Sequence, residues 1–405
     1  MRIIRLVILP CVIAIICPSA QAQASKIASR HHLTVDVRTP KTLTPDIRYI
    51  DVGGFKLRMK IAGAGTPTIV LDAGFGDRIE NWDDIFAEVA RFSRVVAYDR
   101  AGLGKSDPGP EPRTFTRIAT ELHTLLQRAN IPPPYVLVGH SMGGANIRAF
   151  ASLFKNDVAG LVFIDPATEQ ILNVLSAKER EAEFERQEAA LKDAPPGVRA
   201  EWRLLKEGTL NKFSELQSFG TPPDVPTMVL VATRNRPPHW AKSVLDQYGS
   251  WVADEKEGGL VLTADSGHYI QRDEPALVLS AIKRVLFPSV QNALSRAVTD
   301  KGVHQAIAQY REMRQRYPME YFSERILNTL GYEQLRAKHI PEAIALFQLN
   351  VEVYPKAFNT YDSLAEAYAA KGDREAAIKN YRKSLSLNPD NTNAVESLKK
   401  LGAAR

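Results

Sequence analysis

Residues 135–144 read Tyr-Val-Leu-Val-Gly-His-Ser-Met-Gly-Gly. Four residues typical of a buried strand lead into the pattern Gly-x-Ser-x-Gly, and a helical pattern follows directly. A serine between a strand and a helix in this way sits on a sharp, strained turn, and the flanking Gly139 and Gly143 leave room for it. The stretch therefore predicts that Ser141 is a nucleophile held above the edge of a sheet.

Similar apolar runs recur on both sides of this stretch and alternate with helical patterns. Runs that are apolar throughout and separated by helices indicate an α/β fold with a mainly parallel sheet covered on both faces. Two earlier runs flank Gly53-Gly54, whose glycines can adopt the positive φ of a tight hairpin. The predicted strands are 47–52, 55–61, 68–71, 95–98, 135–138, 160–164, 227–231 and 259–263, and the predicted helices are 82–92, 115–129, 145–153 and 274–286.

His268 is the predicted general base. A serine hydroxyl is a weak nucleophile at neutral pH and needs a base within hydrogen-bond reach. Of the eight histidines, His268 alone follows the last predicted strand and precedes the final helix of the sheet region. His140 flanks the nucleophile on the turn and cannot fold back onto it. The other six lie on a helix face, in another loop or outside the sheet region.

Two backbone amides are candidates to stabilise the negative charge of a tetrahedral intermediate. The N–H of Met142 is one, because it belongs to the residue that follows the nucleophile. The second is expected from the loop after the third strand, which contains Gly74-Phe75-Gly76. Its glycines allow close approach of a ligand, so the N–H of Phe75 is the predicted second donor.

Residues 48–288 resemble the α/β-hydrolase family. The resemblance rests on four motifs in the family's order, namely residues 74–76, 98–107, 139–143 and 267–271. It implies an α/β-hydrolase fold, in which Asp99 and Arg100 brace the loop beside the site rather than catalyse. One departure is Ala73, which stands where many members have a histidine before the oxyanion glycine.

The acid that orients the histidine is a second departure from the family. Members usually carry it after the strand that precedes the histidine strand, but residues 232–235 there read Ala-Thr-Arg-Asn. A minority arrangement uses the end of the preceding strand, where this chain has Asp165. We therefore expect Asp165 to be the acid. The alternatives are that Asp165 merely caps the turn that follows and that Asp246 is the acid.

A long segment between Asp165 and the strand at 227–231 interrupts the alternation of strands and helices. It is rich in Glu, Lys, Arg, Leu and Ala, and helical spacing runs through 176–192 and 198–216. Because ligands of open α/β sheets bind at the carboxyl edge, we expect residues of about 166–226 to form a helical lid there. A solvated structural insertion is the alternative.

The strand patterns stop near Pro288, and an internal repeat follows. A single shift along the chain superposes Ala343 on Ala377, Phe347 on Tyr381 and Pro355 on Pro389. This period resembles the tetratricopeptide repeat, a pair of antiparallel helices. Residues 289–405 are therefore expected to form a small all-α domain, with a capping helix over 391–401.

Residues 1–22 have the composition of an export signal. A basic start, an apolar run from Leu6 to Cys17 and Ala20-Gln21-Ala22 follow in the order that a signal peptidase needs. The apolar run is well short of the roughly 20 residues that span a bilayer, so we expect cleavage rather than a membrane anchor. The mature protein would then begin with a linker over 23–47, contain no cysteine, and be periplasmic or extracellular.

These features predict an exported serine hydrolase. Ser141 would attack the carbonyl of a small carboxylic ester, and His268 would transfer the proton. Alternatives are cleavage of amides, as in aminopeptidases, and a silent scaffold whose repeats bind a peptide or protein or associate with each other. We expect no metal, no organic cofactor and no nucleic acid. The formal charge of +6 includes two arginines of the signal and forms no dense basic block.

Overall fold

A computed structural model describes residues 44–167, 176–234, 236, 238–252, 258–287 and 289–403. The expected signal over 1–22 lies outside the described residues, as does most of the expected linker. The chain divides into two compact units between Leu286 and Phe287.

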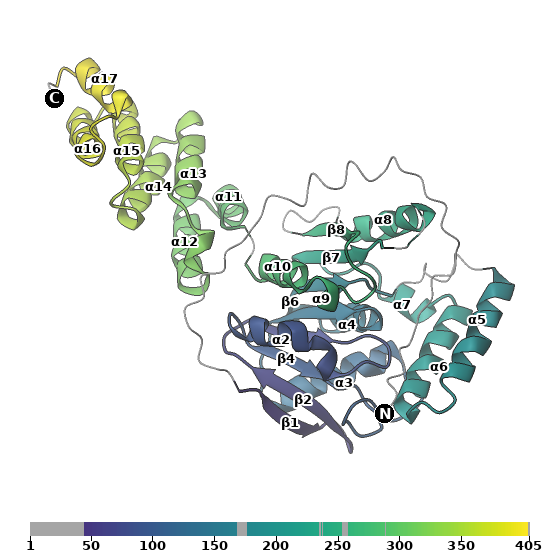
Figure 1. Ribbon diagram of the computed structural model, residues 1–405. Coiled ribbons are helices and arrows are strands. Elements are labelled where there is room, and N and C mark those ends of the chain that lie inside the picture. The colour runs from purple at the N-terminus through teal and green to yellow at the C-terminus, as the bar shows by residue number, and fades with distance from the viewer. Residues whose placement is uncertain are drawn as a thin grey trace. The chain divides into compact units, whose positions relative to one another are not determined.

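An eight-stranded sheet forms the centre of the first unit, in the order β1-β2-β4-β3-β5-β6-β7-β8 (Figure 1). β1 and β2 form a hairpin, β2 is antiparallel to β4, and the remaining pairs are parallel. The strands are β1 (Asp46–Asp51), β2 (Lys56–Ala62), β3 (Thr68–Asp72), β4 (Val95–Tyr98), β5 (Tyr135–His140), β6 (Val158–Ile164), β7 (Thr227–Ala232) and β8 (Gly259–Thr263). The predicted mainly parallel sheet is confirmed.

Helices cover both faces of this sheet. α2, α9 and α10 lie on one face and α3 and α4 on the other (Figure 1). The helices of this unit are α2 (Asp83–Ala90), α3 (Phe115–Arg128), α4 (Met142–Leu153), α5 (Ala177–Ala190), α6 (Pro196–Leu210), α7 (Ser214–Ser218), α8 (Pro238–Val252), α9 (Ile270–Asp273) and α10 (Pro275–Leu286), with 3-10 turns at Ile79–Trp82 and Lys155–Asp157. β3, β4, β5 and β6 are almost entirely buried, which explains their continuous apolar runs.

The described part of the inserted segment, residues 176–226, contains three helices where the sequence pattern suggested two. The long helix expected over 198–216 ends at Leu210, because Lys212 and Phe213 adopt left-handed conformations with φ of 57° and 53°. The ring of Phe213 folds back onto Gly208, where a Cβ would lie only 2.6 Å from it. A contact between side chain and backbone thus ends a helix that propensity alone would continue.

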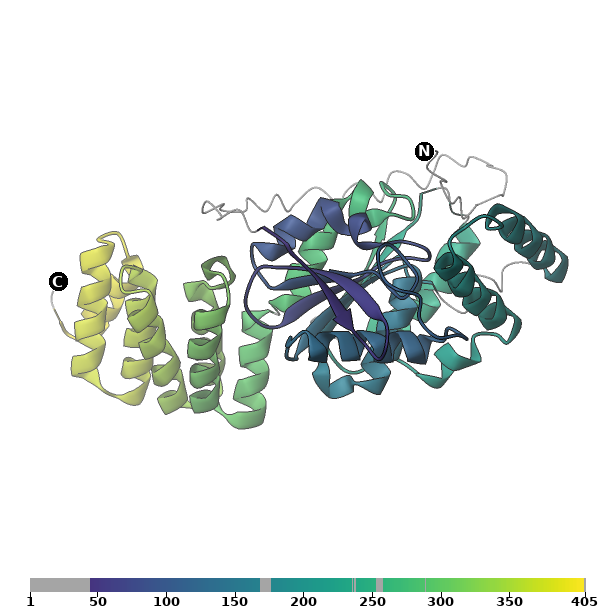
Figure 2. The same ribbon diagram turned by 90° about the horizontal axis from the view of Figure 1, so that it is seen from below.

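The second unit consists of helices, stacked as antiparallel pairs (Figure 2). They are α11 (Val290–Lys301), α12 (Val303–Arg316), α13 (Glu324–Arg336), α14 (Ile340–Val353), α15 (Phe358–Lys371), α16 (Arg374–Leu387) and α17 (Thr392–Lys400), with a 3-10 turn at Met319–Tyr321. α13 and α14 begin at positions 324 and 340, and α15 and α16 begin at 358 and 374, so one shift along the chain relates the two helix pairs. The predicted helical repeat is confirmed.

Gly331 allows the close approach of α13 and α14. A Cβ there would lie closer than 3.0 Å to the ring of the fully buried Phe347. We expect G331A to destabilise the α13–α14 pair by about 1–2 kcal/mol, because overpacking outweighs the helix propensity gained. Amide hydrogen exchange in α13 and α14 would measure this loss. The matched control is G249A in α8, where a Cβ meets nothing within 4 Å. Unchanged protection in G331A would contradict the prediction.

Candidate active site

Ser141 lies on the turn between β5 and α4, at the carboxyl edge of the sheet. Its φ of 52° and ψ of −117° are rare for a residue with a side chain. Its N–H donates to the carbonyl of Ile164 over 3.0 Å, and its own carbonyl accepts from Ala167 over 2.9 Å. These bonds hold the strained turn against the chain on both sides of Asp165.

The two glycines of this turn are required by close backbone contacts. A Cβ on Gly139 would meet the carbonyl of Gly143, and a Cβ on Gly143 would meet the carbonyl of Asp72, in each case closer than 3.0 Å. The turn thus packs directly against the end of β3 and against the first turn of α4. The glycines were expected to leave space around Ser141, and in the structure this space is filled by neighbouring backbone atoms.

Asp165 and His268 meet although 103 positions separate them. Nδ1 of His268 lies 2.5 Å from Oδ2 of Asp165, whose side chain is 3% exposed. The other carboxylate oxygen accepts from the N–H of Ala232 over 3.2 Å. The carboxylate therefore faces Nδ1 and leaves Nε2 of His268 to act on another group. Asp246, the reserve candidate, lies exposed on α8.

His140 connects the nucleophile turn to the loop that carries His268. Its Nε2 lies 2.9 Å from the carbonyl oxygen of His268, and the two rings are 4.7 Å apart between centroids. Among the described residues, which include Ser141 and His268, no hydrogen bond joins the Ser141 hydroxyl to the His268 ring. Such contacts often form only when substrate is bound.

The two predicted oxyanion donors belong to the start of α4 and to the loop after β3. Met142 is the first residue of α4, so its N–H has no partner within the helix. Phe75 belongs to the loop after β3, and its ring packs 6.3 Å from that of Trp202 in α6. Both side chains are buried.

Asp99 and Arg100 lie buried beneath these loops. Asp99 accepts from the N–H of Ile79 over 2.9 Å and from that of Lys105 over 3.0 Å. Arg100 donates from Nη2 to the carbonyl of Gly74 over 2.7 Å. Each side chain is therefore engaged in bracing a backbone loop.

Two residues near the site were not predicted from the sequence. Arg236, which is 20% exposed, donates to the same Oδ2 of Asp165 that contacts His268. It lies in the loop after β7, directly after residues 232–235, where family members usually carry the acid. Glu201 of α6 pairs with Arg100. Arg236 could have been predicted near the site, because a charged residue directly follows residues 232–235, which contain no carboxylate. The sequence around Glu201 contains no comparable indication.

His140 makes stability depend on pH. Burial is the main cause that holds its pKa well below the ordinary value of 6.5. The folded protein then keeps this ring neutral, while the unfolded chain takes up a proton below pH of about 6.5. The unfolded state binds more protons, so the free energy of unfolding falls as pH falls, by at most about 1.4 kcal/mol per pH unit for this group.

We therefore expect H140Q to reduce this dependence of unfolding free energy on pH. Denaturant unfolding between pH 5 and 7 would measure the slope for the wild type and the variant. The control is H304Q, which removes an exposed histidine from α12. Equal slopes in the wild type and H140Q would contradict the expectation.

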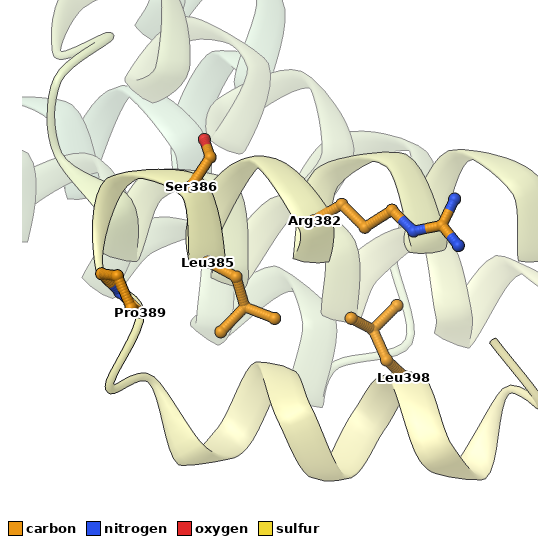
Figure 3. A pocket seen from close by; sticks show the side chains of 5 residues that line it. All are labelled: Arg382, Leu385, Ser386, Pro389 and Leu398. Atoms are coloured by element: carbon orange, nitrogen blue, oxygen red, sulfur yellow. The ribbon is translucent and has the colours of Figure 1, made fainter. Parts of the chain in front are cut away.

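The second unit contains a shallow pocket between α16 and α17. It has a volume of about 310 Å³ and combines apolar side chains with one guanidinium (Figure 3). Its lining residues are Arg382, Leu385, Ser386, Pro389 and Leu398.

In the described ranges, no helix is long and apolar enough to cross a membrane. The same part of the chain contains no cluster of three or more metal-ligating side chains.

Comparison with known proteins identifies the class. The model of the alpha/beta hydrolase family matches residues 69–281, more than half of the chain. The chain therefore belongs to the alpha/beta hydrolase family. A tetratricopeptide repeat model matches residues 358–391. Both resemblances seen in the sequence are thus confirmed.

Several individual proteins are similar to the hydrolase part. The uncharacterized protein YqjL of Bacillus subtilis is 28% identical over 237 residues, which are 57% of this chain and 88% of YqjL. The 2-hydroxy-6-oxo-6-(2'-aminophenyl)hexa-2,4-dienoic acid hydrolase of Metapseudomonas resinovorans is 33% identical over 122 residues, covering 30% of this chain and 42% of that enzyme. A solved α/β hydrolase fold protein from Burkholderia ambifaria has 20% identity and a TM-score of 0.43, covering 58% of this chain and 99% of that one.

Proposed function

We propose that this protein is an exported serine hydrolase that cleaves small carboxylic esters. The observation that supports it best is the contact of 2.5 Å between Asp165 and His268 beside the Ser141 turn. An imidazole whose Nδ1 faces a buried carboxylate can accept a proton at Nε2 and is stabilised when it does so. Export is proposed from the signal-like composition of residues 1–22.

The proposed reaction has two steps. In the first, the Ser141 oxygen bonds to the ester carbonyl carbon while His268 takes the hydroxyl proton and returns it to the leaving alcohol. In the second, water loses a proton to His268 and attacks the acyl carbon. The bond from that carbon to the Ser141 oxygen breaks, His268 returns the proton to this oxygen, and the acid is released. The amides of Phe75 and Met142 would donate to the oxyanion in both steps.

A fluorophosphonate probe tests this proposal, because it reacts covalently with an activated serine. We expect stoichiometric labelling of the full chain and none of S141A, together with turnover of p-nitrophenyl esters. Faster turnover of matched anilides than of esters would favour the amidase alternative. If neither turnover nor labelling occurred while a control hydrolase reacted, the silent scaffold would be supported.

The tetratricopeptide repeats are proposed to bind a protein or peptide partner or a second copy of the chain, as helical repeats commonly present a concave binding surface. A pull-down with the full chain would compare retained partners with those retained by a chain shortened after residue 286. Sedimentation of both chains would report self-association.

A further inference from the structure

Helix α6 of the inserted segment contacts the loop after β3, which carries the predicted oxyanion donor Phe75. Glu201 of this helix is 1% exposed. Its Oε2 accepts from the N–H of Gly76 over 2.9 Å, and its Oε1 accepts from Nε of Arg100 over 2.6 Å. One carboxylate of the insertion therefore binds both the loop itself and the arginine that braces the loop.

Arg100 fixes the orientation of the loop's peptide groups. Its Nη2 donates to the carbonyl of Gly74 over 2.7 Å, and its Nη1 donates to the carbonyl of Ala73 over 2.6 Å. In a trans peptide the C=O and the following N–H point in opposite directions. Because the Gly74 carbonyl points toward Arg100, the N–H of Phe75 in the same peptide points away from it.

The carboxylate of Glu201 determines where this guanidinium can lie. Nη1 of Arg100 also donates to Oδ1 of Asp72 over 2.8 Å, so the guanidinium is held between two carboxylates, one from β3 and one from α6. All three side chains are buried. Without Glu201, the buried guanidinium would lose its ion pair with α6 and keep the one with Asp72, and the N–H of Gly76 would lose its acceptor.

Close backbone packing keeps α6 at this distance from the loops. A Cβ on Gly197, near the start of α6, would lie closer than 3.0 Å to the backbone of Gly102. A Cβ on Gly76 would lie 3.3 Å from the side chain of Val198. The helix thus packs directly on the loops that follow β3 and β4. This packing, together with the ion pair to Arg100, fixes the position of Glu201.

We propose that Glu201 is a positioning residue for the oxyanion hole, acting through Arg100 and Gly76 on the N–H of Phe75. This inference rests on the proposed function and adds to it that the inserted segment supplies part of the catalytic geometry. Glu201 touches no reacting atom in this scheme. Its loss is expected to affect the transition state more than the binding of the ester.

The test compares E201Q with E207Q, which changes an exposed glutamate of the same helix. With p-nitrophenyl acetate, E201Q is expected to lower kcat about 10- to 100-fold, since displaced oxyanion donors cost this much, and to change KM less than about twofold. A trifluoromethyl ketone, which forms a tetrahedral adduct with serine, should bind E201Q more weakly by the same factor as the loss in kcat. E207Q should match the wild type in all three measurements.

Circular dichroism and thermal unfolding establish whether E201Q is folded. If it is not, E201D takes its place: it keeps the charge and withdraws the carboxylate from Gly76 by one methylene, and a smaller loss of kcat is expected. A folded variant with kcat within about twofold of the wild type, or a loss expressed in KM alone, overturns the inference. A wild-type protein that neither turns over esters nor reacts with fluorophosphonate contradicts the proposed function, and the inference falls with it.

Discussion

Ester turnover is expected to fall about 10⁶-fold in kcat when Ser141 is replaced by alanine, because the nucleophile is then missing and only binding and the oxyanion donors remain. S141A should still bind a substrate analogue, since the hydroxyl contributes to bond formation rather than to ground-state affinity. Initial rates with p-nitrophenyl acetate and labelling by fluorophosphonate measure the two consequences of the loss.

The control for S141A is S250A, which removes an exposed hydroxyl from α8. It should keep the wild-type rate. Residual turnover in S141A of more than about one part in a thousand, with the protein free of contaminating esterase, would mean that another group attacks the substrate.

D165N is expected to lower kcat about 10⁴-fold with little change in KM. The amide keeps the shape of the side chain, but its NH2 group cannot accept the hydrogen bond that the Nδ1–H of His268 donates to a carboxylate oxygen. His268 therefore loses the tautomer that leaves Nε2 free to accept a proton. The measurement is kcat and KM for one ester over a range of pH. Thermal unfolding shows whether the variant remains folded.

D246N provides the matched comparison, because Asp246 was the other candidate for the acid and is exposed on α8. It should retain wild-type kcat. If D246N lost activity and D165N did not, the assignment of the acid to the end of β6 would be wrong.

The sheet could be predicted because its central strands are buried on both faces. Continuous apolar runs such as residues 135–138 are typical of parallel strands beneath helices, and the observed strand Tyr135–His140 ends within a few residues of the predicted position. Helix ends were less well predicted. The helix expected over 198–216 ends at Leu210, because Lys212 and Phe213 adopt left-handed conformations.

The carboxyl edge of the sheet could be predicted as the place of the site, and the catalytic roles of its residues stay predictions. A histidine after the last strand and an aspartate at the end of β6 share this edge. The pairing of Asp165 with His268 could therefore be expected from chain order together with the resemblance to the α/β-hydrolase family. Glu201 could not, because its partner Arg100 is 101 positions away and helical spacing does not show what a buried charge contacts.

The repeats show a different kind of predictability. Their period is local in the sequence, so the shift between Phe347 and Tyr381 is enough to place both helix pairs. The period does not show which residues differ between equivalent positions of the repeats. Gly331 occupies the position of Ala365 in the next repeat, because the ring of Phe347 leaves no space for a Cβ there.

Because α6 packs directly on the loop after β4, the inserted segment cannot be exchanged independently of that loop. An inserted segment taken from another protein would need a glycine opposite Gly102, where the two backbones touch. It would also need an acidic side chain one helical turn later to form the ion pair with Arg100. If the whole inserted segment were exchanged for that of another protein, Arg100 would lose its carboxylate partner unless the new segment also carried the glycine and the acidic residue. Diversification of this protein by recombination is therefore easiest along α5 and the solvent side of α6, where Glu181, Glu185 and Arg203 are exposed.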